Sequence, residues 1–493
     1  MKRIHSESLG RGLRRSAFAL ALALSALLPG VATPQTSAPT LPGLINHGLV
    51  GIGRVPADLR DKFGETTVSS SGMAVDPKAW RRDGDTYHGV IYQLPDRGWN
   101  TTGTIDYRAR LHKLSIVFNR ASANAAPQKN ALAVTLADTI LLTDAAGEPL
   151  TGLDPDGVRK AADGFPDMPQ ASNGRISIDP EAVVLLPDGS FFISDEYGPY
   201  IYRFSATGRM LGAIRPPDAL IPMRKGQQNF SSNNPGPGAS APVPPQPETG
   251  RQNNQGFEGL ALTPDGKTLA VILQSSTRQD GGTATTREFT RMLFYDVSDP
   301  ARPKLARHVV VALPVFTDDK GRRRIAAQSE LLALDNERFL LLCRDTSNGY
   351  GLKGATSLYR RIDLLDTRGA TNLLGTGYEG VTPVAPGGTL TPAIKPATLS
   401  DFIDINDNAQ LGRFGLHNGE PNDRNNLSEK WEAMGLLPVL DPAHPRDFFL
   451  LVANDNDFIT QNGYQAGAAY KDDTGVDIDS VFLVYRISLP PAK

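Results

Sequence analysis

The sequence predicts an all-β protein, and within that class a β-propeller. Glycine (48 residues) and proline (38 residues) are frequent. The apolar runs between them are short and rich in β-branched and aromatic residues, as in strands joined by tight turns. A hairpin with polar residues at its open end also recurs along the chain, and recurring strand units are typical of propellers and related arrays. With 493 residues, of which 40% are hydrophobic, the chain can bury a large core.

The first 32 residues have the pattern of a secretory signal peptide. Basic residues precede the apolar run "AFALALALSALLPGVA", which ends in small residues. We expect cleavage after Ala32, a linker over 33–45, and a periplasmic or secreted mature protein. A membrane anchor is the alternative, but an anchor needs roughly 18 or more apolar residues, and this run is interrupted by Ser25 and Pro29. The Arg14–Arg15 pair is a weak indication of twin-arginine export.

Charge and cysteine content exclude several classes of function. Lys and Arg number 51 against 53 Asp and Glu, a formal net charge of -2, so no overall field favours nucleic acid or an anionic membrane. We therefore expect neither as a partner, and we expect a monomer. Cys343 is the only cysteine, so no internal disulfide can form. It lies in the apolar run "RFLLLCRD", where a buried small hydrophobe is expected rather than a nucleophile.

Three segments have the pattern of two strands around a tight turn: "AVVLLPDGSFFISDEY", "LALTPDGKTLAVILQ" and "LLALDNERFLLLCRD". Pro-Asp-Gly provides the turn in the first two, because Pro fixes φ and Gly adopts the left-handed region. Helix signals are scarce. "LSEKWEAMGLL" is the strongest, and "PADLRDKFG" is a second, shorter one.

Alignment of the hairpins on their turns reveals an irregular repeat with acidic residues. Glu181, Glu258, Glu330 and Glu432 each stand just before the first strand of a hairpin, and Ser71–Pro77 is a degenerate copy without the acid. The second strands also end in polar residues: Asp96–Arg97, Asp195–Glu196, Gln274–Ser275, Arg344–Asp345 and Asn454–Asp457. Because a tight turn returns the second strand to where the first began, both sets fall on the same edge.

In a propeller, the innermost strands converge on a central channel. If the repeated hairpins include these strands, the glutamates line one mouth of that channel together with Asp96, Asp195 and Asp345. Carboxylates so close to one another destabilise the folded protein unless a cation or a basic partner compensates their charge. The alternative is structural, since a polar residue at a fixed place in a repeat often caps a turn.

Several segments resemble the phytase-like family whose activity is described as esterase-like activity of phytase. They are "SSSGMAVDP" with "LPDRG", "SDEYGPYIYRF", "NNQGFEGLALTPDGKTLAVILQS" and "SELLAL" with "RFLLLCRD". The resemblance extends roughly from Asn46 to Ser488, so the expected domain spans 46–490. It implies a secreted β-propeller, related by analogy to the calcium-dependent propeller phytases. Six blades follow from that analogy, with five or seven left open.

Two functions remain open. One is a metal-assisted hydrolase of phosphate esters or other esters, which acts on a small anionic or ester substrate with calcium as the cofactor. Arg97 and Arg344 would bind the developing anion, beside Glu181 and Glu258 as catalytic residues. The candidate metal ligands are Glu181, Asp195, Glu196, Glu258, Glu330, Asp345, Glu432 and Asp455. The other function is a non-catalytic propeller that binds a small ligand or partner and carries a structural cation.

Between Arg215 and Gly256 the composition shifts to Pro, Gly, Asn, Gln and Ser. So few apolar residues indicate an extended loop over the scaffold, or partial disorder. Because this segment leads into Glu258, a lid over the site is one hypothesis and a solvated excursion is the other.

Overall fold

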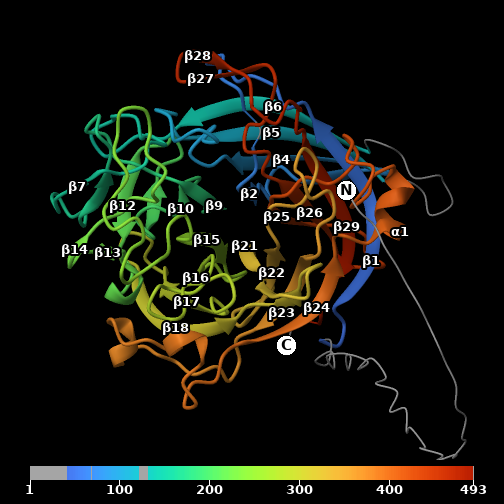
Figure 1. Cartoon of the computed structure of the whole chain (residues 1–493). Coiled ribbons are helices and arrows are strands. Elements are labelled where there is room, and N and C mark those ends of the chain that lie inside the picture. The colour runs from blue at the N-terminus through green and yellow to red at the C-terminus, as the bar shows by residue number, and fades with distance from the viewer. Residues whose placement is uncertain (1–40, 68, 121–130, 492–493) are drawn as a thin grey trace, which may run out of the picture. The chain divides into compact units, whose positions relative to one another are not determined.

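Strands dominate the computed structural model, which describes residues 41–67, 69–120 and 131–491 (Figure 1). The expected signal peptide, its cleavage point and residues 33–40 of the expected linker lie outside the described residues. In the described part, no helix is long and apolar enough to cross a membrane.

Most strands belong to five four-stranded antiparallel units, each in meander order from its first strand outward. The first unit comprises β2 (Gly72–Val75), β4 (Thr86–Leu94), β5 (Arg110–Asn119) and β6 (Leu132–Leu141). The second comprises β9 (Pro180–Leu185), β10 (Phe191–Asp195), β11 (Ile201–Phe204) and β12 (Met210–Ile214). The third comprises β15 (Phe257–Leu262), β16 (Thr268–Leu273), β17 (Phe289–Asp296) and β18 (Lys304–Ala312). The fourth comprises β21 (Ala327–Ala333), β22 (Arg338–Arg344), β23 (Arg360–Asp366) and β24 (Thr398–Asp404).

The fifth unit is assembled from both ends of the chain. It comprises β25 (Trp431–Pro438), β26 (Asp447–Asn454), β29 (Ser480–Ser488) and β1 (Ile45–Val55). β1 pairs antiparallel with β29, and it also pairs in parallel with β6 through Gly53 and Leu132. The first and fifth units therefore form one sheet, which has nine strands because β3 (Arg81–Asp83) pairs with β4. The N-terminal strand therefore joins the last unit to the first.

Short elements decorate the units. The small hairpins are β7 (Gly157–Arg159) with β8 (Met168–Gln170), β13 (Met223–Arg224) with β14 (Gln227–Gln228), β19 (Val315–Thr317) with β20 (Arg323–Ile325), and β27 (Gly463–Gln465) with β28 (Ala468–Tyr470). The helical turns of the described part are α1 (Asn408–Leu411), η1 (Asp218–Leu220), η2 (Gly377–Glu379), η3 (Pro386–Gly388) and η4 (Gly412–Phe414).

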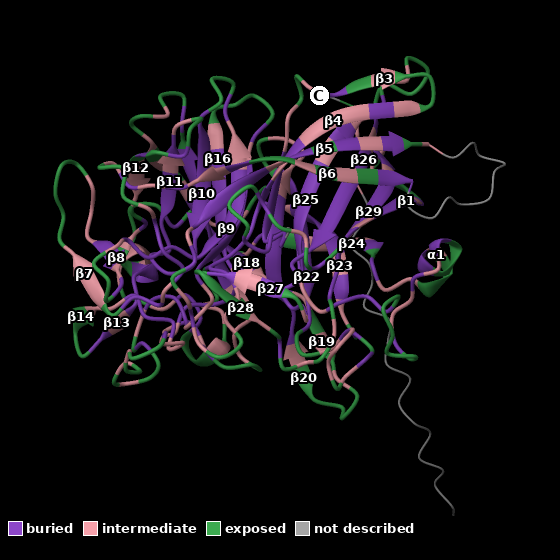
Figure 2. Ribbon diagram, turned by 90° about the horizontal axis from the view of Figure 1, so that it is seen from above, coloured by how far each residue is buried: buried purple, intermediate pink, exposed green. Residues whose placement is uncertain are grey.

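The first strands of the units contact one another in a closed ring. β2 contacts β9, β9 contacts β15, β15 contacts β21, β21 contacts β25, and β25 contacts β2 again (Figure 1). One large hydrophobic cluster lies between each pair of neighbouring units, five in all. Figure 2 shows the result, with β9 and β25 largely buried and many of the outer loops exposed. Because each unit covers both neighbours, inner strands such as β10, β16 and β22 are buried on both faces and have nearly continuous apolar sequences, whereas the outer strands β12 and β24 are partly exposed.

The three hairpins expected from turn chemistry are confirmed as β9–β10, β15–β16 and β21–β22. Both helix expectations were wrong. The segment "WEAMGLLP" is strand β25, and residues 56–64 form turns with an isolated bridge at Arg60. Burial decided the first case, since β25 is covered on both faces and Trp431 and Met434 belong to the cluster shared with the fourth unit. Tertiary packing of this kind overrides helix propensity.

Cys343 lies on β22 and is fully buried. Burial raises the pKa of its thiol well above the usual range, and the nearby Asp363 adds to the rise. Since the thiolate is the reactive species, we expect a thiol reagent such as DTNB to leave the folded protein unmodified and to titrate one thiol after denaturation. Rapid modification of the folded protein would contradict the buried position.

Candidate functional site

The polar residues of the repeat lie at the open ends of five equivalent hairpins. Glu181, Glu258, Glu330 and Glu432 occupy β9, β15, β21 and β25, the strands that form the ring. We call these four residues the glutamate cluster. In each of the four hairpins the strand register shifts at or beside the glutamate. A β-bulge of this kind leaves one residue out of the ladder and redirects its side chain.

The glutamate cluster is buried, and its members repel one another. Each glutamate is at most 6% exposed. Burial raises the pKa of Glu181 and of Glu258 well above the usual range, and the charges of neighbouring acids, Glu258 on Glu181 among them, raise both further. Burial also raises the pKa of Glu432 to about 7, although Lys430 and Arg344 oppose the rise. Carboxylates in this position need protons, a cation or basic side chains to balance them.

Several carboxylate oxygens of this region lack a partner. Oε2 of Glu196 and of Glu258 is buried and accepts no hydrogen bond, and the buried Oε2 of Glu432 accepts none either, although Lys430 Nζ lies 3.5 Å from it. Within the described residues, the carboxylate of Glu181 forms neither a hydrogen bond nor an ion pair, although it lies near other acids. Buried polar atoms are normally satisfied, and unsatisfied ones indicate strain, a functional role or a bound water or ion. Their concentration in one cluster favours a cation.

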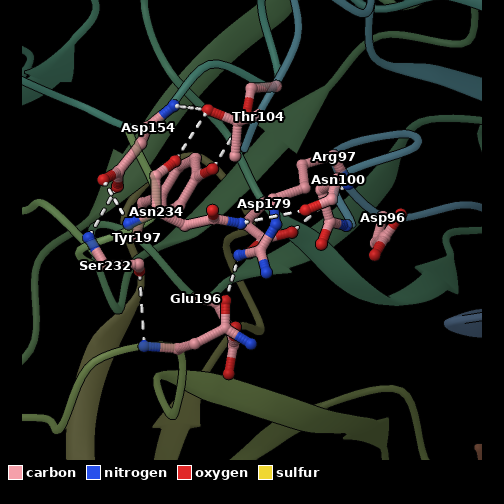
Figure 3. A network of polar contacts seen from close by, with 12 residues as sticks. Asp96, Arg97, Asn100, Thr104, Asp154, Asp179, Glu196, Tyr197, Ser232 and Asn234 are labelled. Atoms are coloured by element: carbon pink, nitrogen blue, oxygen red, sulfur yellow. Dashed lines mark hydrogen bonds and ion pairs between the residues drawn. The ribbon is translucent and has the colours of Figure 1, made fainter. Parts of the chain in front are cut away.

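Asp179, Glu181 and Glu196 come closest to a metal-binding arrangement. All three are buried, and one oxygen from each lies within 4.8 Å of the others. Figure 3 shows Asp179 and Glu196 near Arg97. Burial raises the pKa of Asp179 to about 7, the Arg97 charge lowers it, and the Glu196 carboxyl beside it raises it again. Among the described residues, the one cation in direct contact with the group is Arg97, which pairs with Asp179.

A second acidic group, Asp96, Asp455 and Asp457, also has its oxygens within 4.8 Å of one another, but a lysine already fills it. Lys430 Nζ lies 2.5 Å from Asp455 Oδ2 and 2.9 Å from Asp457 Oδ1, and also reaches Glu432 and Asp96. Burial alone would raise the pKa of Asp455, but Lys430 and the Ser69 hydroxyl lower it to about 2. A cation of the chain itself therefore occupies this group, although burial and neighbouring acids still raise the pKa of Asp96 and of Asp457.

Both arginines expected to bind an anion are paired with carboxylates. Arg97 pairs with Asp179 and also donates to Asn254. Arg344 pairs with Glu432 through Nη2, while its Nε donates to Ser329 Oγ at 3.1 Å. Their charges balance the acids of the site in the first instance. Arg344 also lines a neighbouring cavity.

Three other candidate ligands hold the local backbone. Asp195 accepts from the amides of Asp179, Tyr197 and Gly198 and from the Tyr202 hydroxyl. Asp345 accepts from Ser357 Oγ, the Leu358 amide and Asn348 Nδ2. Glu330 accepts from the Leu331 amide at 2.8 Å. Nothing in these contacts requires a cation, so the structural interpretation fits these three residues best.

Sequence reasoning missed Asp179 and Lys430, yet the signal was present. Each stands two residues before a repeat glutamate, Asp179 before Glu181 and Lys430 before Glu432. Neither residue lies in the strand itself, since β9 begins at Pro180 and β25 at Trp431. A charged residue two positions before the glutamate is the signal that marks both.

The Pro- and Asn-rich segment between Arg215 and Gly256 is tied to the site. Arg224 binds carbonyl oxygens of Pro244, Ser231 and Pro245, and Asp154 accepts from Ser231, Ser232 and Asn234 at one end of it (Figure 3). Its last residues contribute Asn254, which contacts Arg97, and the Gly256 amide, which donates to Glu196 at 3.2 Å. A Cβ at Gly256 would lie 2.2 Å from the Glu196 carbonyl oxygen, so only glycine fits there. The segment thus forms part of the wall around Glu196.

The chain belongs to the phytase-like family whose model is described as esterase-like activity of phytase, since that model matches residues 70–458. An uncharacterized secreted protein of Arthroderma benhamiae is 40% identical over 461 residues, which cover 85% of this chain and 88% of that protein. The family identified from sequence motifs is therefore confirmed. The relative's description states that it is secreted and nothing about its activity.

The chain also has weak similarity to several solved structures, with low TM-scores and little shared sequence. A luciferin-regenerating enzyme is 10% identical with a TM-score of 0.28, over 89% of this chain and 95% of its own. Regucalcin of Agrobacterium tumefaciens, titled a calcium-binding protein, is 9% identical with a TM-score of 0.29 over the same shares. A gluconolactonase of Xanthomonas campestris is 10% identical with a TM-score of 0.24, over 93% of this chain and 99% of its own. At these TM-scores the likenesses carry no argument about the chemistry of this chain.

Proposed function

We propose that the protein is an exported five-bladed β-propeller hydrolase that uses calcium to cleave phosphate esters or other esters. The observation that carries the proposal is the group of Asp179, Glu181 and Glu196. These are three buried acids with oxygens within 4.8 Å of one another, and one buried Glu196 oxygen has no partner. The family and the secreted relative support the enzyme class and the export.

Five blades follow from the strand groups rather than from analogy. The closed ring of β2, β9, β15, β21 and β25 and the five clusters between units support five repeats, where the analogy with phytases suggested six. In a propeller, the pairing of β1 with β29 closes the last blade with strands from both ends of the chain. Closure of this kind leaves only short, protected strand edges.

Calcium fits the donor set. Every candidate ligand is a carboxylate oxygen, and hard cations such as calcium prefer oxygen ligands. Glu181 and Glu196 would hold the ion with Asp179, and Glu258, whose buried Oε2 accepts no hydrogen bond, belongs to the neighbouring glutamate cluster. A bound calcium ion would polarise an ester oxygen and make a water molecule more acidic.

The chain's own residues would orient this site. Arg97 fixes the Asp179 carboxylate, and the Gly256 amide fixes one oxygen of Glu196. Lys430 occupies the second acidic group, whereas in the group of Asp179, Glu181 and Glu196 the described residues provide a basic partner for Asp179 alone. Arg344 lies between the glutamate cluster and the neighbouring cavity, since it pairs with Glu432 and also lines that cavity.

A non-catalytic propeller with a structural cation is the second candidate. The low exposure of Glu258 and Glu432, 2% and 1%, favours it, because a structural cation needs no access for a substrate. In this case the protein would bind calcium and a small ligand without turnover.

An assay of the purified mature protein separates the two candidates. We expect turnover on a panel of phosphomonoesters, phytate and simple esters, loss of turnover with EDTA, and its return with added calcium. Calcium binding measured by calorimetry without turnover on any substrate would favour the binding protein. Turnover that is indifferent to EDTA would contradict the metal-assisted mechanism.

A further inference from the structure

We propose that a cavity of about 600 Å³ beside the glutamate cluster binds a phosphoryl group of a small molecule, with Arg287 as its principal contact. Its walls come from three places: the segment before β17 that contains Arg287, the β19–β20 hairpin, and the residues that follow β22. The volume lies in the range of small-molecule sites.

The charges that line the cavity favour an anion. Five basic side chains face three acids; the basic residues are Arg287, Lys320, Arg322, Arg324 and Arg344. Two of the acids are already engaged by the protein. Asp318 is bound by Arg322 at 2.7 Å and by Arg324 at 3.0 Å, and Asp345 accepts three hydrogen bonds from its own loop. The third acid, Asp319, is exposed to solvent.

Two of the five basic side chains, Arg287 and Lys320, form no ion pair within the described residues, and of these Lys320 is exposed whereas Arg287 is partly buried. The Nε of Arg287 is buried without a hydrogen-bond partner. Burial lowers the pKa of Arg287, and the charges of Arg344 and Arg324 lower it further. An anion between these three arginines would relieve the repulsion and provide the missing acceptor.

A phosphoryl group fits this arrangement better than a carboxylate. Guanidinium groups bind phosphate through paired hydrogen bonds, and several positive charges around one site match a group that carries up to two negative charges. The cavity also shares Arg344 with the glutamate cluster. The inference thus rests on the proposed function for the fate of the bound group, whereas binding can be measured without turnover.

The test is calorimetry in EDTA with inorganic phosphate and phytate as probes and citrate as the carboxylate control. We expect the unaltered protein to bind phytate and phosphate, and Arg287→Gln to weaken both by roughly 10- to 100-fold, the value of a charge-assisted hydrogen bond. The affinity of Arg287→Lys should lie between those of the unaltered protein and Arg287→Gln, because lysine keeps the positive charge but lacks the paired N–H donors of the guanidinium group. Arg81→Gln is the matched control, since Arg81 is exposed and outside the cavity. Arg324→Gln tests the same cavity through a second residue, and thermal melting checks that each variant folds.

Equal phytate affinity in Arg287→Gln and the unaltered protein, no binding by the unaltered protein, or citrate bound as tightly as phytate would each overturn the inference. Failure of the proposed hydrolase gives a different result. Binding that depends on Arg287 without any ester turnover would leave the cavity assignment intact. If Arg287→Gln instead hydrolysed phosphate esters in a calcium-dependent way with an unchanged KM, the cavity would not be the phosphoryl site, whereas the proposed hydrolase function would be supported.

Discussion

Replacement of Lys430 by methionine is expected to destabilise the folded protein by about 3 kcal/mol at pH 7 in EDTA, at the lower end of the cost of breaking a buried ion pair. The ammonium group contacts Asp455 and Asp457 and lies within 4 Å of Glu432 and Asp96. Asp455, Glu432 and Asp96 are each at most 3% exposed, so their charges would lose compensation in a place that water does not reach. Because the Lys430 side chain is itself 20% exposed, we do not expect the destabilisation to reach the upper end of the range for buried ion pairs, about 5 kcal/mol.

Urea unfolding followed by circular dichroism measures this loss. The double variant Lys430→Met with Asp455→Asn should recover part of the stability, since it removes one of the stranded charges. Lys353→Met is the control, because Lys353 is exposed and forms no ion pair in the described part of the chain. If Lys430→Met changes the free energy of unfolding no more than the control does, Lys430 does not balance the acidic group.

Glu181→Gln and Glu258→Gln are expected to have opposite effects with and without calcium. Each change keeps the shape of the side chain and removes a negative charge from the cluster. Without calcium, the repulsion between buried carboxylates decreases, so the melting temperature should rise or stay unchanged. With calcium, affinity should fall by at least about 10- to 100-fold, the loss typical even of residues that only support a ligand, and the calcium-dependent rise in melting temperature should shrink accordingly.

Calorimetry with calcium and thermal melting in EDTA provide the two readouts, and Glu337→Gln is the control because Glu337 is exposed. If Glu181→Gln and Glu258→Gln left calcium affinity, thermal stability and any measured hydrolysis unchanged, the repeated acids would be ordinary turn-capping residues. The functional interpretation of the repeat should then be dropped.

Local sequence predicted the hairpins well and the helices poorly. Pro-Asp-Gly and the β-branched runs on both sides of it defined β9–β10 and β15–β16, because turn chemistry acts within a few residues. "LSEKWEAMGLL" failed because its apolar residues serve two neighbouring units. A strand buried on both faces has no alternating pattern to distinguish it from a buried helix.

The candidate site shows the same division. The repeat placed Glu181, Glu258, Glu330 and Glu432 at equivalent positions, and their approach to one another follows from it. The repeat could not reveal that Asp195, Asp345 and Glu330 are engaged by nearby donors, since these partners depend on how each loop turns. Nor could it reveal Arg287, whose importance arises from Arg324 and Arg344 far along the chain.

The sequence by itself determined the all-β class, the family, the repeated hairpin and the edge on which its acids stand, because turn residues and strand periodicity act over short distances. Only the tertiary structure decided the number of strand units, the joining of β1 to β29, and which acids are balanced by Lys430, Arg97 and Arg344. These features depend on contacts between residues tens to hundreds of positions apart. Charge balance within a buried cluster is set by such contacts, and no local pattern encodes it.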